Sequence, residues 1–465
     1  MSPEELIDSH WDRILAELED FLRIPSVSTD SAHRSDIEAA AAWVAERLQA
    51  AGPFRVDVLP TSGHPAVYAE WLGAPGRPTI LVYGHYDVQP PDPIDRWRSA
   101  PFEPEVRDGR IYARGCSDDK GPMLIPIKAA EALFSAEGRL PVNVKLLFEG
   151  EEEIGSPSLE PFLTEHRELL SADFALSADG AMWRADLPSI TVGSRGMAAL
   201  NLEIEGPGKD LHSGRHGGAV QNPLHALAEL LASLHHPDGS VAVEGFYDAV
   251  CEASPAERAA IAALPWDDDA YREEIGVSEL WGAAGFSTLE RQWIRPTLEV
   301  NGLGGGYAGE GSKTVIPARA FAKLTCRLVP DQEPDRILEL VDAHLHRRLP
   351  PGVRLRTHRL PGSARAYRIL PDHPGLQIAR DVLRELDGRN PVDVLIGGTL
   401  PVTEAFARIL GIDTVFFSFS TADEDFHAPN EFFRLDRFRD GMRAWIRYWE
   451  AAALEVGAMA GEARR

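Results

Sequence analysis

Short apolar runs separated by helical patterns dominate the two ends of the chain. Four of these runs are rich in β-forming residues, namely 79–83 (TILVY), 142–148 (VNVKLLF), 174–178 (FALSA) and 414–419 (TVFFSF). Continuous apolar runs of this length are typical of strands that are buried on both faces. Their alternation with helical patterns predicts an α/β domain, in which a mostly parallel sheet has helices on both faces.

The middle of the chain has a different pattern. Apolar and polar residues alternate over 200–204 and again over 322–328, as expected of half-buried antiparallel strands. Helical patterns lie between these two stretches. We therefore predict an inserted α+β domain over residues 190–370 and a first domain formed by residues 1–189 and 371–465.

Composition agrees with two domains and excludes several classes of partner. A chain of 465 residues is longer than a single core usually supports. The formal net charge of −25 argues against binding to nucleic acid or to an anionic membrane surface. No apolar run approaches the roughly 20 residues of a membrane span, and the start of the chain predicts a surface helix rather than a signal peptide. The three cysteines form no CxxC pair, which excludes a thiolate zinc site and favours a cytoplasmic location.

Potential metal ligands follow the predicted strands or open a helix. His85 and Asp87 follow the first strand, and the acidic turn EGEEEIG follows the second. Asp179 follows the third strand, His427 follows the fourth, and Asp118 precedes a helical pattern. Each group alone has an ordinary explanation as a surface pair, a helix cap or a solvated turn. Because ligands gather at the carboxyl ends of strands in open α/β sheets, their joint occurrence predicts a metal site.

Charge counting favours two metal ions. In the arrangement that we predict, Asp118 bridges the ions. The other ligands divide into two pairs, His85 with Asp179 and Glu153 with His427. Three carboxylates leave one positive charge on two divalent cations, and a bridging hydroxide makes the cluster neutral. Imidazole and carboxylate ligands suit zinc best, with manganese or cobalt as alternatives.

Glu152 is next to Glu153 in the sequence but is not needed as a ligand of either metal ion. It can accept the proton of the attacking water, which is general-base catalysis by a positioned carboxylate. Asp87 leaves the strand on the same face as His85, so its carboxylate can hold the imidazole in the metal-binding tautomer. We therefore predict a hydrolase in which two metals generate the hydroxide and polarise the scissile carbonyl.

These residues, together with the motifs DLHSGRHGG, KTVIP and RLVP, resemble the M20 metallopeptidase family, especially its carnosinase-like cytosolic dipeptidases. The resemblance extends from about residue 20 to about residue 435. It implies a catalytic domain with a di-zinc or di-manganese centre, and it implies the same metal ligands and the same general base. It also implies that the inserted domain is a lid that mediates homodimerisation.

The resemblance gives roles to three residues of the inserted domain. His212 in DLHSG resembles a histidine that reaches into the partner subunit's active site and stabilises the tetrahedral oxyanion. Thr314 in KTVIP and Arg327 in RLVP resemble residues that bind the substrate carboxylate, which a guanidinium matches in geometry. The expected reaction is hydrolysis of a dipeptide or similar small amide with a free carboxylate. An N-acyl-amino-acid deacylase, a carboxypeptidase and a non-catalytic metal-binding protein remain alternatives.

Overall fold

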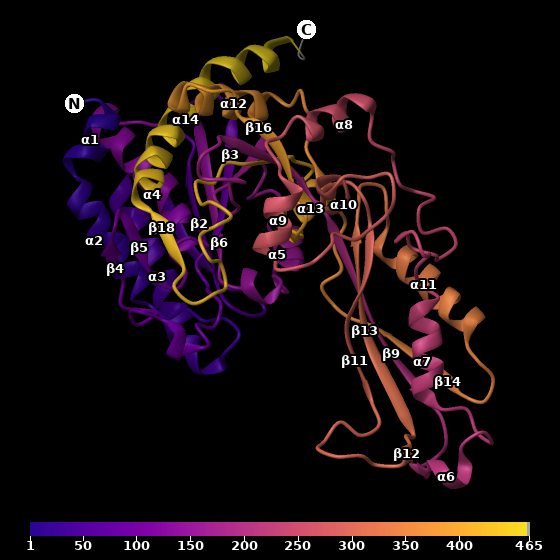
Figure 1. Ribbon diagram of the computed structural model, residues 1–465. Helices are drawn as coiled ribbons and strands as arrows, with labels where there is room; N and C mark the ends of the chain where they lie inside the picture. The colour runs from indigo at the N-terminus through magenta and orange to yellow at the C-terminus, as the bar shows by residue number, and fades with distance from the viewer. Residues whose placement is uncertain (463–465) are drawn as a thin grey trace. The chain divides into compact units, whose positions relative to one another are not determined.

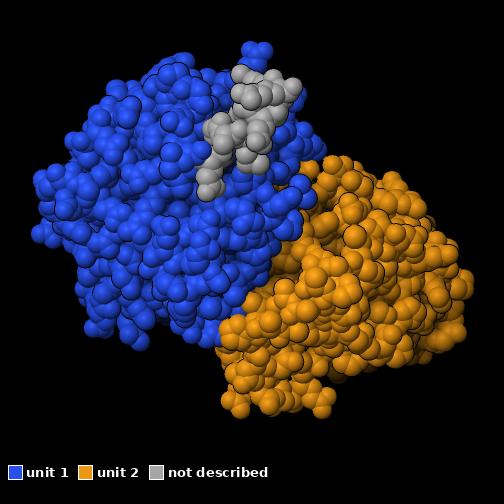
Figure 2. Space-filling view, turned by 90° about the horizontal axis from the view of Figure 1, so that it is seen from above, with its two compact units in different colours: residues 1–192, 369–394, 405–465 blue, residues 193–368, 395–404 orange. Residues whose placement is uncertain are grey.

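The computed structural model describes residues 1–462 of the chain. Contacts between residues divide it into two compact units, which Figure 2 shows in separate colours. Unit 1 contains residues 1–192, 369–394 and the chain from 405 onward, and unit 2 contains Gly193–Arg368 and Leu395–Glu404. The sequence placed residues 395–404 in the first domain, but their contacts group them with unit 2. The backbone N–H of Arg195, which donates to Ile396 O at 3.2 Å and to Gly398 O at 3.0 Å, is one such contact.

A six-stranded sheet forms the centre of unit 1 (Figure 1). Its strands are, in spatial order, β1 (Arg55–Leu59), β2 (Ala66–Trp71), β6 (Asn143–Glu149), β3 (Thr79–His85), β7 (Phe174–Ser177) and β17 (Thr414–Phe416). β6, β3, β7 and β17 are parallel neighbours, whereas β2 runs antiparallel to both β1 and β6. The four parallel neighbours coincide with the four apolar runs, so the prediction of a mostly parallel sheet is confirmed.

Helical segments cover both faces of this sheet. Successive side chains of a strand point to opposite faces of the sheet, so Tyr83 and Gly84 of β3 face opposite sides of it. A Cβ atom at Gly84 would lie 3.0 Å from Met123 Cγ of helix α4 (Lys120–Glu137). On the other face, the ring of Tyr83 meets the ring of Phe406 edge-on, with centroids 5.6 Å apart. Gly84 therefore allows α4 to approach the strand closely at the point where the strand ends.

The remaining helices surround this sheet or lie in its connections. They are α1 (Pro3–Ser9), α2 (Trp11–Leu22), η1 (Ser31–His33), α3 (Arg34–Ala51), η2 (Ile94–Arg96), η3 (Glu152–Ile154), α5 (Leu159–Glu165), α12 (Pro374–Asp387), η4 (Phe406–Leu410) and α14 (Leu435–Glu462). Helix α13 (Pro401–Ala405) belongs to unit 2 except for its last residue. The first helix begins as predicted, because Ser2 and Glu5 form a reciprocal capping box. None of the helices in residues 1–462 has both the length and the apolar character needed to cross a bilayer.

Two three-stranded sheets lie outside the six-stranded sheet and the four-stranded sheet. One has the order β18 (Phe432–Arg434), β5 (Arg110–Tyr112) and β4 (Glu105–Arg107). The other has the order β15 (Tyr367–Arg368), β8 (Ser189–Ser194) and β16 (Val392–Ile396). The strand over Leu395 and Ile396 therefore does not enter the six-stranded sheet, contrary to the expectation that this run returns to the first domain.

Unit 2 contains a four-stranded antiparallel sheet. Its order is β11 (Thr297–Gly305), β13 (Arg319–Leu328), β9 (Gly196–Glu205) and β14 (Arg354–Arg359). Helices α7 (Pro223–Ala232) and α11 (Pro334–Arg348) pack on one face of the sheet (Figure 1). The core between them includes Leu200, Leu202, Ile204, Leu227, Leu230, Leu324, Cys326, Ile337 and Val341. The alternation read from the sequence is thus confirmed, since alternate residues of β9 and β13 enter this core.

The shorter elements of unit 2 lie in its loops. They are β10 (Leu211–His212), α6 (Ser213–His216), α8 (Pro255–Ala262), α9 (Asp268–Glu274), α10 (Thr288–Trp293) and β12 (Val315–Ile316). β10 and β12 pair as a two-stranded antiparallel ribbon. This ribbon extends from one end of the four-stranded sheet (Figure 1).

Candidate active site

The five predicted metal ligands come together at the carboxyl ends of the parallel strands of unit 1. His85 is the last residue of β3, and Asp179 follows β7. Glu153 lies in the turn after β6, and His427 lies in the loop between β17 and β18. Asp118 lies in the loop that leads into α4. Parallel strands end at one edge of a sheet, which is why groups far apart in the sequence meet here.

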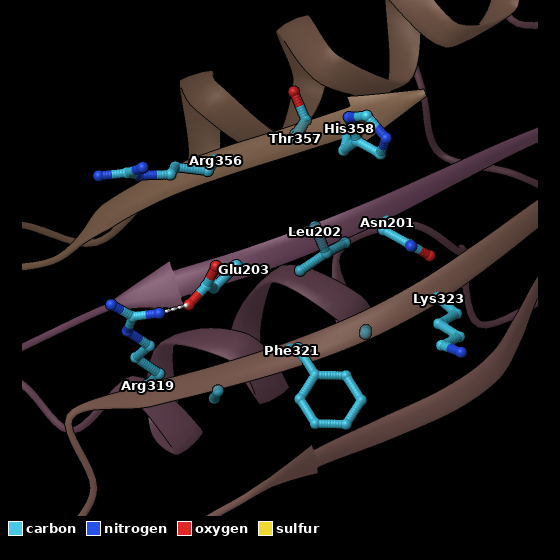
Figure 3. Close-up of a pocket in the computed structure, with 11 residues that line it drawn as sticks. Asn201, Leu202, Glu203, Arg319, Phe321, Lys323, Arg356, Thr357 and His358 are labelled. Carbon is cyan, nitrogen blue, oxygen red and sulfur yellow. Dashed lines mark ion pairs between the residues drawn. The ribbon is translucent and has the colours of Figure 1, made fainter. Parts of the chain in front are cut away.

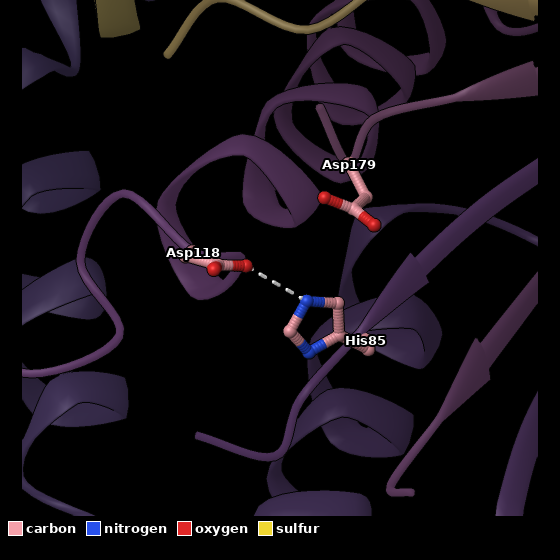
Figure 4. A group of neighbouring side chains, drawn as sticks. All are labelled: His85, Asp118 and Asp179. Atoms are coloured by element: carbon pink, nitrogen blue, oxygen red, sulfur yellow. Dashed lines mark hydrogen bonds and ion pairs between the residues drawn. The ribbon is translucent and has the colours of Figure 1, made fainter. Parts of the chain in front are cut away.

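The possible ligand atoms form two groups that share Asp118. The atoms of His85, Asp118 and Asp179 lie within 4.8 Å of one another (Figure 4), and so do those of Asp118, Glu153 and His427. Asp118 Oδ1 is 3.0 Å from His85 Nε2, whereas Asp118 Oδ2 is 2.9 Å from His427 Nε2. The two oxygens of this carboxylate therefore face different imidazoles, which is the arrangement that a bridging ligand requires.

Asp87 contacts both the ring of His85 and the turn that carries the glutamates. The His85 Nδ1–H donates to the backbone carbonyl of Asp87 at 3.1 Å, which leaves Nε2 free to bind a metal. The Asp87 carboxylate is 3.4 Å from His85 Nδ1 and accepts the backbone N–H groups of Glu152 at 3.2 Å and Glu153 at 3.0 Å. The sequence anticipated the contact with the ring, but the structure adds the contacts with the turn.

Glu152 and Glu153, the last two glutamates of this turn, have different surroundings. Gln89 Nε2 donates to Glu153 Oε2 at 2.8 Å, and the same oxygen is 3.2 Å from His427 Nε2. Glu153 is therefore oriented toward the second ligand group. Glu152 belongs to neither group of possible ligands within residues 1–462, although it is the next residue in the chain.

Crowding of carboxylates shapes the electrostatics of the site. Burial raises the pKa of Asp179 to about 6 and that of Glu153 to about 7, and the charge of Asp118 adds to both shifts. Burial, together with the neighbouring carboxylates, also raises the pKa of Glu152 well above its usual value. Hydrogen bonds to Asp118 and Glu153 raise the pKa of His427 to about 10. The carboxylates of this cluster therefore repel one another. Divalent cations would relieve this repulsion, so the donor set fits two metal ions.

In unit 2, the ribbon places two residues of the lid motifs side by side. His212 pairs with Val315, and the backbone N–H of Ser213 donates to Thr314 O at 3.0 Å. The side chains of His212 and Thr314 are both exposed. His212 Nδ1 accepts the N–H of Gly214 at 3.0 Å, so its proton resides on Nε2, which points a hydrogen-bond donor outward.

Arg327 lies at the other end of the same unit. It is near the end of β13, whose first residues follow the ribbon strand β12 (Figure 1). From Arg319 to Arg327 the strand extends roughly 26 Å, at about 3.3 Å per residue. One small substrate therefore cannot contact both Thr314 and Arg327 of the same chain. Within this chain, Arg327 therefore lies apart from Thr314, which was expected to bind the same carboxylate, and apart from His212, which was expected to act in the site of a partner subunit.

Arg327 has neighbours that the sequence did not indicate. Its guanidinium donates to Thr399 Oγ1 at 2.7 Å. Arg195 donates from Nε to Gly397 O at 2.9 Å, and burial and the charge of Arg327 lower its pKa to about 10. Neither guanidinium forms an ion pair with a carboxylate in the described part of the chain. Two half-buried guanidinium groups that are not in direct contact with a carboxylate form a site suited to a substrate carboxylate. Neither Arg195 nor Thr399 carried a distinguishing sequence signal.

Unit 2 also has a large hollow on its surface. It has a volume of about 610 Å³ and lies on the open face of the unit 2 sheet (Figure 3). Arg319 and Glu203 form an ion pair in it at 3.0 Å, and Phe321 and Lys323 line the floor beside them. No residue of the two ligand groups lines this hollow. The candidate active site is therefore identified by its metal-binding side chains and not by the size of a cavity.

Residues 81–451, most of the length of the chain, match Peptidase family M20/M25/M40. The chain belongs to this family. The resemblance inferred from the motifs is therefore confirmed at the level of the whole chain. The match begins within β3, just before His85, and ends within α14, so every residue of both ligand groups lies inside the M20 region.

Named M20 relatives align with this chain over nearly its whole length. It is 30% identical over 459 residues to the Cys-Gly metallodipeptidase dug1 of Schizosaccharomyces pombe, covering 96% of each protein. It is 30% identical over 450 residues to the Beta-Ala-His dipeptidase of Homo sapiens, covering 92% of this chain and 87% of that protein. The solved M20 family metallo-carboxypeptidase Sso-CP2 from Sulfolobus solfataricus has a TM-score of 0.84 and 33% identity, covering 95% of this chain and 99% of that structure. Both dipeptidases and a carboxypeptidase thus share this architecture.

Proposed function

We propose that this M20 protein is a metal-dependent dipeptidase that hydrolyses the amide bond of dipeptides at a centre of two divalent ions. The observation that carries the proposal is the position of Asp118 between two ligand groups, with Glu152 beside them and in neither. The full-length relatives named as dipeptidases support the same reaction.

Each proposed ion has its own set of ligands. The proposed ligands are His85 and Asp179 for one ion, Glu153 and His427 for the other, and Asp118 for both. Zinc is the proposed metal because imidazole and carboxylate ligands suit it, and manganese or cobalt would be bound by the same donors. When bound, the two cations would polarise the scissile carbonyl and lower the pKa of the attacking water.

Glu152 is the proposed general base. Its carboxylate takes the proton of the attacking water and returns it to the leaving amine. Burial raises the pKa of Glu152 well above its usual value, and its carboxylate belongs to neither ligand group, so it is available to accept a proton. Asp87 contributes indirectly, because its carboxylate accepts the backbone N–H of Glu152 and holds the turn in place.

The substrate carboxylate is proposed to bind at Arg327. The hydrogen bond from Arg327 to Thr399 and the nearby charge of Arg195 support this assignment. A bidentate guanidinium would select substrates with a free carboxyl terminus. The three free cysteines are compatible with work in the cytoplasm, which we propose as the location.

We further propose a homodimer in which the partner subunit supplies His212 and Thr314. These residues lie at the opposite end of unit 2 from Arg327, so a single small substrate needs them from another chain. His212, with its proton on Nε2, would donate a hydrogen bond to the oxyanion of the tetrahedral intermediate.

A complementation experiment tests this arrangement. His212→Ala and Glu152→Gln are each expected to lose most activity. When the two variants are refolded together in equal amounts, about one quarter of wild-type activity is expected to return, because half of the dimers are mixed and each has one intact site. Light scattering checks that the refolded protein is dimeric. No recovery in confirmed mixed dimers, or a fully active monomer, would contradict the shared site.

A substrate screen tests the reaction itself. Chelation is expected to abolish hydrolysis, and added Zn²⁺ or Mn²⁺ is expected to restore it. Dipeptides, including Cys-Gly and β-Ala-His, should be cleaved faster than tripeptides, longer peptides and N-acyl amino acids. Preference for release of the last residue of longer peptides would identify a carboxypeptidase, which the similarity to Sso-CP2 makes the second candidate. Preference for N-acyl amino acids would identify a deacylase, and full metal occupancy without any hydrolysis would identify a binding protein.

A further inference from the structure

The loop that carries Asp118 is held by a buried carboxylate outside both ligand groups. Glu431 is 0% exposed and lies four residues after His427. Its Oε2 accepts the backbone N–H of Gly115 at 2.9 Å. Its Oε1 accepts the backbone N–H of Ser117 at 2.9 Å and that of Asp118 at 3.2 Å. One carboxylate therefore binds three of the four amides that lead to and include the bridging residue.

Arg114 connects the same two segments. This residue is 1% exposed, and its Nη1 forms an ion pair with Glu431 Oε2 at 2.6 Å. Its Nη2 donates to Ala428 O at 3.3 Å and to Pro90 O at 3.4 Å. Ala428 follows His427 directly. Arg114 thus extends the contact between the loop of Asp118 and the loop of His427.

The loop of His427 is itself closed at its base. The backbone N–H of Phe432 donates to Glu424 O at 3.2 Å, and Phe432 pairs with Tyr112 between strands β18 and β5. His427 therefore projects from a loop whose two ends are joined, and Glu431 lies at one of those ends. Glu431 therefore joins the loop of Asp118 to the loop of His427, and these two residues are ligands of the same proposed ion.

We propose that Glu431 is a positioning residue of the dimetal centre. It sets the backbone of the loop 115–118 so that Asp118 stands between the two ligand groups before any metal arrives. Because this role concerns metal binding, it rests on the proposed function. Partners that orient metal ligands typically change metal affinity 10–100-fold when they are mutated. The same dependence is expected here, with the larger loss at the ion that needs both Asp118 and His427.

Glu431→Gln is the informative substitution because it keeps the size of the side chain. It replaces one accepting oxygen with an NH₂ group, which then faces backbone N–H groups and the Arg114 guanidinium. Donors cannot bond to donors, so the loop must shift. Isothermal titration of Zn²⁺ into the metal-free protein is expected to show two ions for the wild type and at least about tenfold weaker binding of one of them for the variant. The d–d absorption of Co²⁺ at that site should change as well.

Glu424→Gln is the matched control. Glu424 is equally buried and lies in the same segment, but it accepts the Ser117 hydroxyl, the Thr421 N–H and Arg434 rather than the amides of 115–118. Its loss should lower the unfolding temperature of the metal-free protein about as much, while Zn²⁺ affinity stays close to that of the wild type. Equal loss of affinity in both variants, or unchanged affinity in Glu431→Gln, would overturn the positioning role.

A measurement on the wild-type chain separates this inference from the proposed function. The amide protons of Gly115, Ser117 and Asp118 are expected to exchange slowly with deuterium in the metal-free protein, because Glu431 accepts them without metal. Exchange as fast as in an exposed loop would overturn the inference even if the enzyme binds two ions. Slow exchange in a protein that binds no metal would instead leave the loop contact intact and refute the proposed function. The same measurement serves if Glu431→Gln does not fold.

Discussion

Glu152→Gln is expected to lower kcat for dipeptide hydrolysis by about 10²–10⁴-fold, the usual contribution of a general base, while both metal ions stay bound. Glutamine has the same shape as glutamate but cannot take a proton from water. The turn should remain in place, because the backbone N–H of residue 152 still donates to Asp87. Steady-state kinetics and metal analysis of the same preparation separate the loss of chemistry from a loss of metal.

Glu151→Gln provides the control for this experiment. Glu151 is buried in the same acidic turn and accepts the backbone N–H of His64 at 3.1 Å, a bond that the carbonyl oxygen of glutamine can keep. It belongs to neither ligand group in the described chain, so activity should stay within a few-fold of the wild type. Wild-type turnover in Glu152→Gln would remove the assigned base, and loss of metal from that variant would make Glu152 a ligand.

Asp118→Asn is expected to weaken the binding of both metal ions, whereas Asp179→Asn should weaken only one. Asp118 contributes to both ligand groups and Asp179 to one. An amide in place of Asp118 removes a negative charge from between the cations and turns a donor toward one of the two imidazoles. Each affected ion should bind at least about 10–100-fold more weakly, the range seen even for residues that only orient ligands.

Metal analysis after dialysis and Zn²⁺ titration check this difference. The expected order of bound metal is two ions for the wild type, about one for Asp179→Asn and fewer for Asp118→Asn. Hydrolysis should fall in the same order. Equal metal content in the two variants would contradict the bridging assignment, and two tightly bound ions in Asp118→Asn would exclude it.

The sequence alone was sufficient to predict the mostly parallel sheet of unit 1 and to propose the residues that meet in the candidate metal centre. Buried parallel strands read as short continuous apolar runs, and β3, β6, β7 and β17 appear where those runs occur. Asp179 follows one such run directly and His85 follows another after Gly84, and the geometry of an open sheet brings strand ends together. A local signal was therefore sufficient to predict a contact between residues far apart in the chain.

The sequence did not determine which lid residues can act together. The resemblance assigned Thr314 and Arg327 to one substrate carboxylate and His212 to the active site of a partner subunit. The antiparallel register of β13 instead places Arg327 at the far end from the ribbon that carries Thr314 and His212. Hydrophobic alternation shows that a strand is half-buried, but it does not show where along the strand a loop attaches. Only the pairing of the strands in the structure showed at which end of the sheet each residue lies.

Only the tertiary structure decided how the ligands are held. Asp87 reaching the amides of the glutamate turn and Glu431 reaching the loop of Asp118 are contacts of side chains with distant backbone. Any buried carboxylate can accept such bonds, and the hydrophobic pattern carries no information about which amides lie within reach. The same holds for residues 395–404, whose place in unit 2 depends on backbone pairing with the chain near Arg195. Periodicity of apolar residues specified the elements and the ligand chemistry, whereas long-range hydrogen bonds between loops specified the geometry of the centre.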